Sequence, residues 1–211
     1  MSKNTRYFLI GAAVVLALSL GTGLVAYYNG GLPGSDRTSD ADLAYLPANA
    51  AAVGYADVRT IMSSEFRQKL RQVLPTGEEK DKIQAELGVD LEKDIDSVAV
   101  AYTGASSSPF EGALVIVRGR LNEGQIEALA TQHGATASEY QGKKILSMNE
   151  QHHTEGQGTP AIAFLEQGAL AFGELTTLKA AIDSAATGND VRKNAELMAI
   201  VNDVRSSGNA W

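Results

Sequence analysis

The sequence has 211 residues, no cysteine and a net charge of −7. Without cysteine the chain forms no disulfide, thiolate metal site or cysteine nucleophile, and it carries no lipidated cysteine. Setting aside the positive charges of Lys3 and Arg6 leaves a net charge of −9 on the rest of the chain. That acidity argues against binding to nucleic acid, and it disfavours binding to anionic lipid headgroups. The apolar fraction of 44% is ordinary for a globular domain.

Residues 7–28 form an uncharged run, YFLIGAAVVLALSLGTGLVAYY. As a helix, this run covers roughly 33 Å, about the thickness of the hydrocarbon core of a bilayer. Positive charge flanks it only on its N-terminal side, so residues 1–6 are expected to form a cytoplasmic tail. We therefore predict a single transmembrane helix in a bacterial inner membrane, surrounded by lipid, with the rest of the chain in the periplasm.

A cleaved secretory signal is the alternative interpretation of this run. Such signals have a shorter apolar region of about 7–15 residues that ends in a small-x-small site. Here the run is longer, and Ala26 follows Leu24 rather than a small residue two places before it. An uncleaved anchor is the preferred interpretation.

Small residues recur every four positions along the predicted span, at Ala13, Ala17 and Gly21. They share one helix face, and small residues at this spacing let two transmembrane helices approach closely. We predict that this face packs against another membrane protein. The alternative is that alanine and glycine, which are common in any span, have this spacing by chance.

Residues 29–43 are rich in Gly, Ser, Asp and Pro and are predicted to be a flexible linker. Residues 44–211 are predicted to form the extracytoplasmic domain. Within it, residues 51–57 are expected to form a strand, with Asp57 as the N-cap of a helix. That helix places Met62, Phe66, Leu70 and Val73 on one face, and a charged helix ending at Gly88 follows.

The middle of the domain is predicted to contain a hairpin, formed by strands 96–104 and 110–119. The unbroken segment ALVIV in the second strand indicates a central strand that is covered on both faces, or at least a strand well away from an edge of the sheet. A helix capped by Asn122 follows, and its inward residues are Ile126, Leu129 and Ala130.

The last third is predicted to contain a hairpin turning at Gly142, another over 160–175 that turns at EQG, and two helices. The first helix buries Leu178, Ala181, Ile182 and Ala185. The second begins at Asn194 and carries four apolar residues at helical spacing, Leu197, Ile200, Val201 and Val204. The final AW is expected to begin a further strand, so either Trp211 docks back onto the domain or the chain is truncated.

Three segments share the order strand, short polar break and amphipathic helix: AVGYADVRTIM, LVIVRGRLNEGQI and LAFGELTTLKAAI. Hairpins that alternate with helices are typical of the α+β class. We predict an antiparallel sheet with helices packed on one face and ferredoxin-like elements, preceded by the transmembrane helix.

The segments YLPANAAAVGYADV, DIDSVAVAYTG, YQGKKILSM and GNAW, in this order, resemble a group of single-span envelope proteins found in acidobacterial genomes. The resemblance covers roughly residues 45–211 and implies an envelope location. In that group the chain continues past the equivalent of the final tryptophan. The group has no established catalytic residues, so the resemblance implies no site.

Few residues form a pattern typical of a catalytic or metal site. His152 and His153 lie between two glutamates in a predicted loop, and imidazole and carboxylate are good zinc ligands. Adjacent histidines rarely converge on one ion, so they are only weak candidates for a metal site, and a solvated loop is preferred. His133 is expected at the end of a helix. No catalytic residue and no cofactor is predicted.

The leading hypothesis is a non-enzymatic, single-pass membrane protein. It would serve as an accessory or interaction subunit of a larger membrane complex, for example an energy-transducing respiratory or photosynthetic assembly. A ligand-binding module of the envelope is the alternative, and a metal-dependent hydrolase around His152 and His153 is a third possibility.

Overall fold

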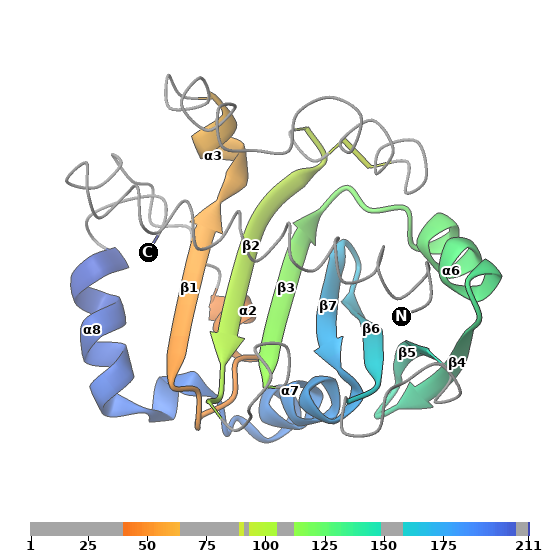
Figure 1. Cartoon of the computed structure of the whole chain (residues 1–211). Coiled ribbons are helices and arrows are strands. Elements are labelled where there is room, and N and C mark those ends of the chain that lie inside the picture. The colour runs from red at the N-terminus through yellow and green to blue at the C-terminus, as the bar shows by residue number, and fades with distance from the viewer. Residues whose placement is uncertain (1–39, 64–88, 91–92, 105–111, 149–157, 206–210) are drawn as a thin grey trace.

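The computed structural model describes residues 40–63, 89–90, 93–104, 112–148, 158–205 and 211. These residues form one antiparallel sheet of seven strands in the order β1-β2-β3-β7-β6-β5-β4. Figure 1 shows α8 beside β1 at one end of the sheet and α6 beside β4 at the other. The predicted α+β class with an antiparallel sheet is confirmed.

The first three strands run from one edge of the sheet to its centre. They are β1 (Ala52–Asp57), β2 (Ile95–Tyr102) and β3 (Ala113–Gly119). All residues from 113 to 117 are buried, because β2 and β7 flank β3 and side chains cover both of its faces. This confirms the predicted central strand. A short helix, α3 (Val58–Ser63), follows β1, and the Thr60 N–H donates to the Asp57 carboxylate at 2.9 Å, as the predicted N-cap requires.

The other four strands run from the opposite edge back to the centre. After α6 (Glu123–Gln132) come β4 (Ala135–Tyr140), β5 (Lys143–Met148), β6 (Pro160–Glu166) and β7 (Ala169–Glu174). β7 then pairs with β3, with Ile116 opposite Ala171. Both predicted hairpins are present. The first turns through Gln141 and Gly142, whose φ angles of 49° and 74° fit a two-residue turn with two left-handed residues.

Three further helices and a 3₁₀ turn complete the described chain. They are α2 (Asp40–Leu43), α7 (Leu175–Thr187), the 3₁₀ turn η2 (Val191–Lys193) and α8 (Ala195–Arg205). The linker predicted for residues 29–43 includes α2. In the structure the side chains of Asp42 and Leu43 are each only 1% exposed, so this end of the predicted linker packs against the domain.

Helices cover both faces of the sheet, so the prediction of helices on one face is wrong. Side chains alternate along a strand, and neighbouring Ile145 and Leu146 therefore point to opposite faces. Ile145 belongs to the core cluster that contains Leu178 and Ile182 of α7. Leu146 instead belongs to the cluster that contains Ile126 of α6. The cause is that β3, β6 and β7 bury consecutive residues, which leaves both faces of the sheet apolar.

The strand order also differs from the predicted ferredoxin-like elements. In the split β-α-β unit of a ferredoxin-like fold, one strand lies between the two parallel strands that the helix joins. Here α6 joins the central β3 to the edge strand β4, and three strands, β7, β6 and β5, lie between them.

Among the described helices, none is both long and apolar enough to cross a membrane. The predicted span at residues 7–28, its packing face and the predicted tail at residues 1–6 lie outside the described part of the chain.

Candidate functional site

The structure does not describe the residues that the sequence singled out as site candidates. His152 and His153, like Ala13, Ala17 and Gly21, lie outside the described residues. Across the described ranges, no group of three or more His, Cys, Asp or Glu residues could hold a metal ion.

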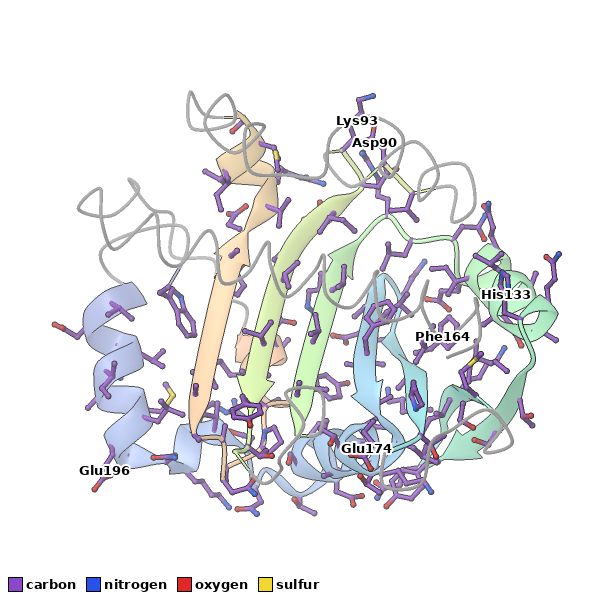
Figure 2. All side chains as sticks on the ribbon, viewed as in Figure 1. Asp90, Lys93, His133, Phe164, Glu174 and Glu196 are labelled. Atoms are coloured by element: carbon purple, nitrogen blue, oxygen red, sulfur yellow. The ribbon has the colours of Figure 1, made fainter. Side chains whose placement is uncertain are left out.

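The charged side chains labelled in Figure 2 lie in different parts of the molecule, apart from Asp90 and Lys93, which form an ion pair at 2.9 Å. Figure 2 shows His133, Glu174 and Glu196 in different parts of the molecule rather than converging on one point. His133 caps the C-terminus of α6, as expected from the sequence, and its backbone N–H donates to the Leu129 carbonyl at 3.0 Å. Its role in the structure is to end this helix.

Arg118 forms the most buried ionic cluster that the structure describes. Its Nε donates to the carboxylate of Asp42, and another guanidinium nitrogen donates to Glu166 at 2.5 Å. Burial opposes the charge of the guanidinium, but the hydrogen bonds to the two carboxylates outweigh it and raise the pKa of Arg118. The group stays protonated, so the cluster ties α2, β3 and β6 together and offers no acid or base.

Asp190 forms a second buried ion pair, at the start of η2. Its carboxylate is 1% exposed and accepts hydrogen bonds from Nε and a terminal nitrogen of Arg192 at 2.8 and 2.6 Å. The Arg192 side chain lowers the pKa of Asp190, although burial opposes the shift. The backbone of Asp190 forms an isolated antiparallel β-bridge with Pro47, and the Val191 N–H donates to the Leu46 carbonyl at 2.8 Å. These backbone contacts hold the chain between α7 and α8 against the segment that follows α2.

A shallow hollow of about 300 Å³ lies between this segment and the C-terminal half of α7. Two of its lining side chains already form hydrogen bonds within the domain. The Asp183 carboxylate accepts from the Tyr140 hydroxyl at 3.0 Å, and the Ser184 hydroxyl donates to the Ala180 carbonyl at 2.8 Å. The hollow has room for a small ligand, but these two lining groups are already engaged. It is lined by Pro47, Ala48, Asn49, Ala180, Asp183, Ser184, Thr187 and Asn189.

Trp211 lies against the outer edge of β1, which is an edge strand of the sheet. The Tyr55 N–H donates to the Trp211 carbonyl at 2.7 Å, and the Trp211 N–H donates to the Tyr55 carbonyl at 2.9 Å. The two rings are stacked, with centroids 5.9 Å apart. Two residues that exchange both backbone bonds form a hydrogen-bonded pair of an antiparallel ladder. Trp211 thus docks onto the domain, which was one of the two alternatives.

The helix beside this edge, α8, has an apolar surface. Leu197 packs against the core and Val201 is 2% exposed, whereas Ile200 is 61% exposed and Val204 37% exposed. The sequence placed all four on one face, and the structure divides them into an inner pair and an outer pair. Ile200 and Val204 are the exposed large apolar side chains of the described chain. We call the outer edge of β1 together with Ile200 and Val204 the β1–α8 surface.

The sequence gives no signal for this surface. Apolar residues at i, i+3, i+4 and i+7 form the usual stripe by which a helix packs on a core. The spacing therefore predicts that all four residues are covered, whereas the structure leaves Ile200 and Val204 exposed.

Comparisons with protein families, with curated proteins and with solved structures gave no match to this chain. The resemblance to acidobacterial envelope proteins therefore stays a prediction.

Proposed function

We propose that the protein is a non-enzymatic, single-pass membrane protein of the inner membrane, with its domain in the periplasm, and that it is an accessory subunit of a larger membrane complex. The observation that supports this proposal best is the β1–α8 surface, where Ile200 and Val204 expose apolar side chains one helical turn apart. Apolar side chains exposed together on a helix surface are typical of protein–protein contacts. The uncharged run of residues 7–28 supports the membrane location.

The test is native gel electrophoresis and native mass analysis of the protein after gentle extraction from its own membrane. Wild-type protein is expected to migrate with a larger complex. The substitution Ile200→Lys should release it, because it places a charge in the apolar contact. Ala199→Lys adds the same charge to the neighbouring exposed position of α8 and serves as the matched control. Migration of the wild-type protein as a detergent-bound monomer would contradict the proposal.

The span is tested separately. Replacing Ala13, Ala17 and Gly21 with leucine keeps the run apolar but fills the predicted packing face. If this face packs against another helix of the complex, the variant should remain in the membrane but no longer migrate with the complex. If the variant still migrates with the complex, the span is a plain anchor and the periplasmic domain alone makes the contact.

The hollow beside α7 favours a second candidate, a ligand-binding module of the envelope. Screening small polar compounds for a rise in melting temperature tests this candidate. Ala180→Phe is the matching variant, because Ala180 is exposed and lines the hollow, so a ring at this position should fill it and remove the rise. A rise that persists in this variant would place the ligand elsewhere.

A further inference from the structure

Two hydroxyls that line the hollow beside α7 can act toward a ligand only as hydrogen-bond acceptors. The Ser184 hydroxyl donates its hydrogen to the Ala180 carbonyl at 2.8 Å. The Thr187 hydroxyl donates its hydrogen to the Asp183 carbonyl, also at 2.8 Å. Because a hydroxyl has a single hydrogen, only lone pairs remain on these two oxygens. This wall of the hollow therefore favours a ligand that donates hydrogen bonds.

Asp183 adds a negative charge to this lining. Its carboxylate accepts hydrogen bonds from the Tyr140 hydroxyl at 3.0 Å and from the Gln141 side-chain amide, which are both neutral donors. No lysine or arginine in the described part of the chain forms an ion pair with Asp183. The buried carboxylates of Asp42 and Asp190 differ in this respect, because each is paired with an arginine. The charge of Asp183 therefore lacks a cationic partner among the described residues.

Lys179 lies one helical turn before Asp183 on α7 but does not neutralise it. Its ammonium lies over the Tyr140 ring, 5.3 Å from the ring centroid. A lysine four positions before an acidic residue also forms a weaker pair than the reverse order, which suits the helix dipole better. The C-terminal end of α7 carries partial negative charge from its last carbonyls, which adds to the charge of Asp183. The hollow thus favours a cation that the neighbouring lysine does not supply.

The two oxygens of the Asp183 carboxylate are not equally engaged. Oδ1 accepts from both Tyr140 and Gln141, whereas Oδ2 accepts only from Tyr140, at 3.0 Å. A guanidinium binds a carboxylate best through both oxygens at once, whereas an ammonium can donate to a single oxygen. The unequal engagement therefore favours an ammonium. Pro47 and Ala48 add apolar contact to the lining, which suits a short hydrocarbon chain.

We propose that this hollow binds a small organic cation with a primary ammonium group and a short apolar chain. The ammonium donates to Oδ2 of Asp183, and the chain lies against Pro47 and Ala48. The volume of about 300 Å³ is at the lower end of the range for small-molecule sites, so the ligand has few atoms. The inference rests on the second candidate function, the ligand-binding module, because it names the class of ligand.

Titration calorimetry of the purified full-length protein in a non-ionic detergent tests this inference, with butylammonium chloride as the probe. We expect saturable binding. Butan-1-ol has the same chain without the charge and should bind at least about tenfold more weakly, because it forms no charge-assisted hydrogen bond. Butylguanidinium has the same charge and chain but a planar, bidentate head group, and it should also bind more weakly than butylammonium.

Three protein variants test where the ammonium binds. Asp183→Asn keeps the shape of the side chain but removes its charge, and it should weaken binding at least about tenfold. Ala180→Phe keeps Asp183 but fills the hollow, and it should abolish binding. Glu123→Gln removes the same charge from α6, which packs on the opposite face of the sheet, and it should leave binding unchanged. Melting curves show whether the variants fold, and the comparison of butylammonium with butan-1-ol needs only the wild type.

Three results would overturn the inference: absence of butylammonium binding, equally tight binding of butan-1-ol, or equally tight binding by Asp183→Asn. Tighter binding of butylguanidinium would reject the ammonium group. If butylammonium does not bind, but another polar compound raises the melting temperature of the wild type and not that of Ala180→Phe, the ligand class alone is wrong. If no compound raises the melting temperature of the wild type, the second candidate function is wrong as well.

Discussion

Asp42 and Arg118 are 76 residues apart in the chain, yet the Arg118 guanidinium donates a hydrogen bond to the Asp42 carboxylate inside the domain. The Asp42 side chain is 1% exposed and the Arg118 side chain 21% exposed. This pair joins α2 to the central strand of the sheet. If the predicted anchor precedes α2, the pair also joins the anchored end of the chain to the middle of the domain.

Arg118→Met is expected to lower the free energy of unfolding by about 3–5 kcal/mol, because it leaves the buried Asp42 carboxylate without this cation. Urea denaturation measures the loss. The double variant Asp42→Leu/Arg118→Met removes both charges and should recover most of it, since an apolar pair of similar volume is often neutral. A double variant as unstable as the sum of the two single variants would show that the pair does not act as a unit.

Asp190→Asn is expected to cost about 2 kcal/mol at neutral pH, because it removes a buried, charge-assisted acceptor from Arg192. The pKa of Asp190 is lower in the folded protein than in the unfolded chain. The stabilisation is therefore fully present above the unfolded carboxyl pKa of about 4 and is lost as the pH falls through the lower folded value. Unfolding curves of wild type and variant between pH 7 and pH 2 should converge at the acid end, and a constant difference would contradict the assignment.

Ionisation of the buried Tyr55 hydroxyl is expected to lower the free energy of unfolding at high pH. Burial raises the pKa of Tyr55 to about 12; a hydrogen bond with Ser97 opposes this shift and the charge of Asp57 adds to it. A raised folded pKa means that the stabilisation is complete below the unfolded value of about 10 and disappears as the pH rises through 12, a change of up to about 3 kcal/mol. Comparing the pH dependence of unfolding for wild type and Tyr55→Phe isolates this residue. The phenylalanine variant should lack that part of the alkaline loss.

Gly119→Ala is expected to destabilise the domain by about 1–3 kcal/mol. A Cβ at this position would lie 2.0 Å from the Asp94 carbonyl oxygen, where β2 and β3 meet at a register shift. Gly124→Ala, in the exposed first turn of α6, is the control. There the nearest atom lies at 3.6 Å, and alanine should leave stability unchanged or raise it by about 0.5–1 kcal/mol. The melting temperature of Gly119→Ala should fall, and that of Gly124→Ala should rise or stay unchanged.

The parts of the fold that the sequence predicted well depend on neighbouring residues. The Gln125 N–H donates to the Asn122 side chain three residues earlier, and the β4–β5 turn needs only Gln141 and Gly142. The unbroken apolar run of β3 indicated burial on both faces directly. Caps and turns depend on hydrogen bonds between near neighbours, and the burial of a strand depends on the order of its apolar and polar residues. Both can be read directly from the sequence.

The parts that it missed depend on distant residues. Nothing near Ile116 indicates that its partner is Ala171, so the strand order and the use of both faces could not be inferred from periodicity. The same holds for the candidate surface. Helical spacing placed Ile200 beside Val201, but only the packing of α8 against the sheet end decides which of the two is covered.

The pairing of β3 with β7 joins two runs of strands that start at opposite edges of the sheet. Cutting the chain between Arg120 and Leu121 would give one piece with β1, β2 and β3 and another with β4 to β7. These pieces would meet along that pairing, at the bridge between Pro47 and Asp190 and at the ladder pair of Tyr55 and Trp211. Each piece would lack a neighbour for its inner strand until the other arrived. We expect separately produced pieces to reconstitute the sheet only when mixed, and the intact chain to fold slowly for its size, because its central contact closes a long loop.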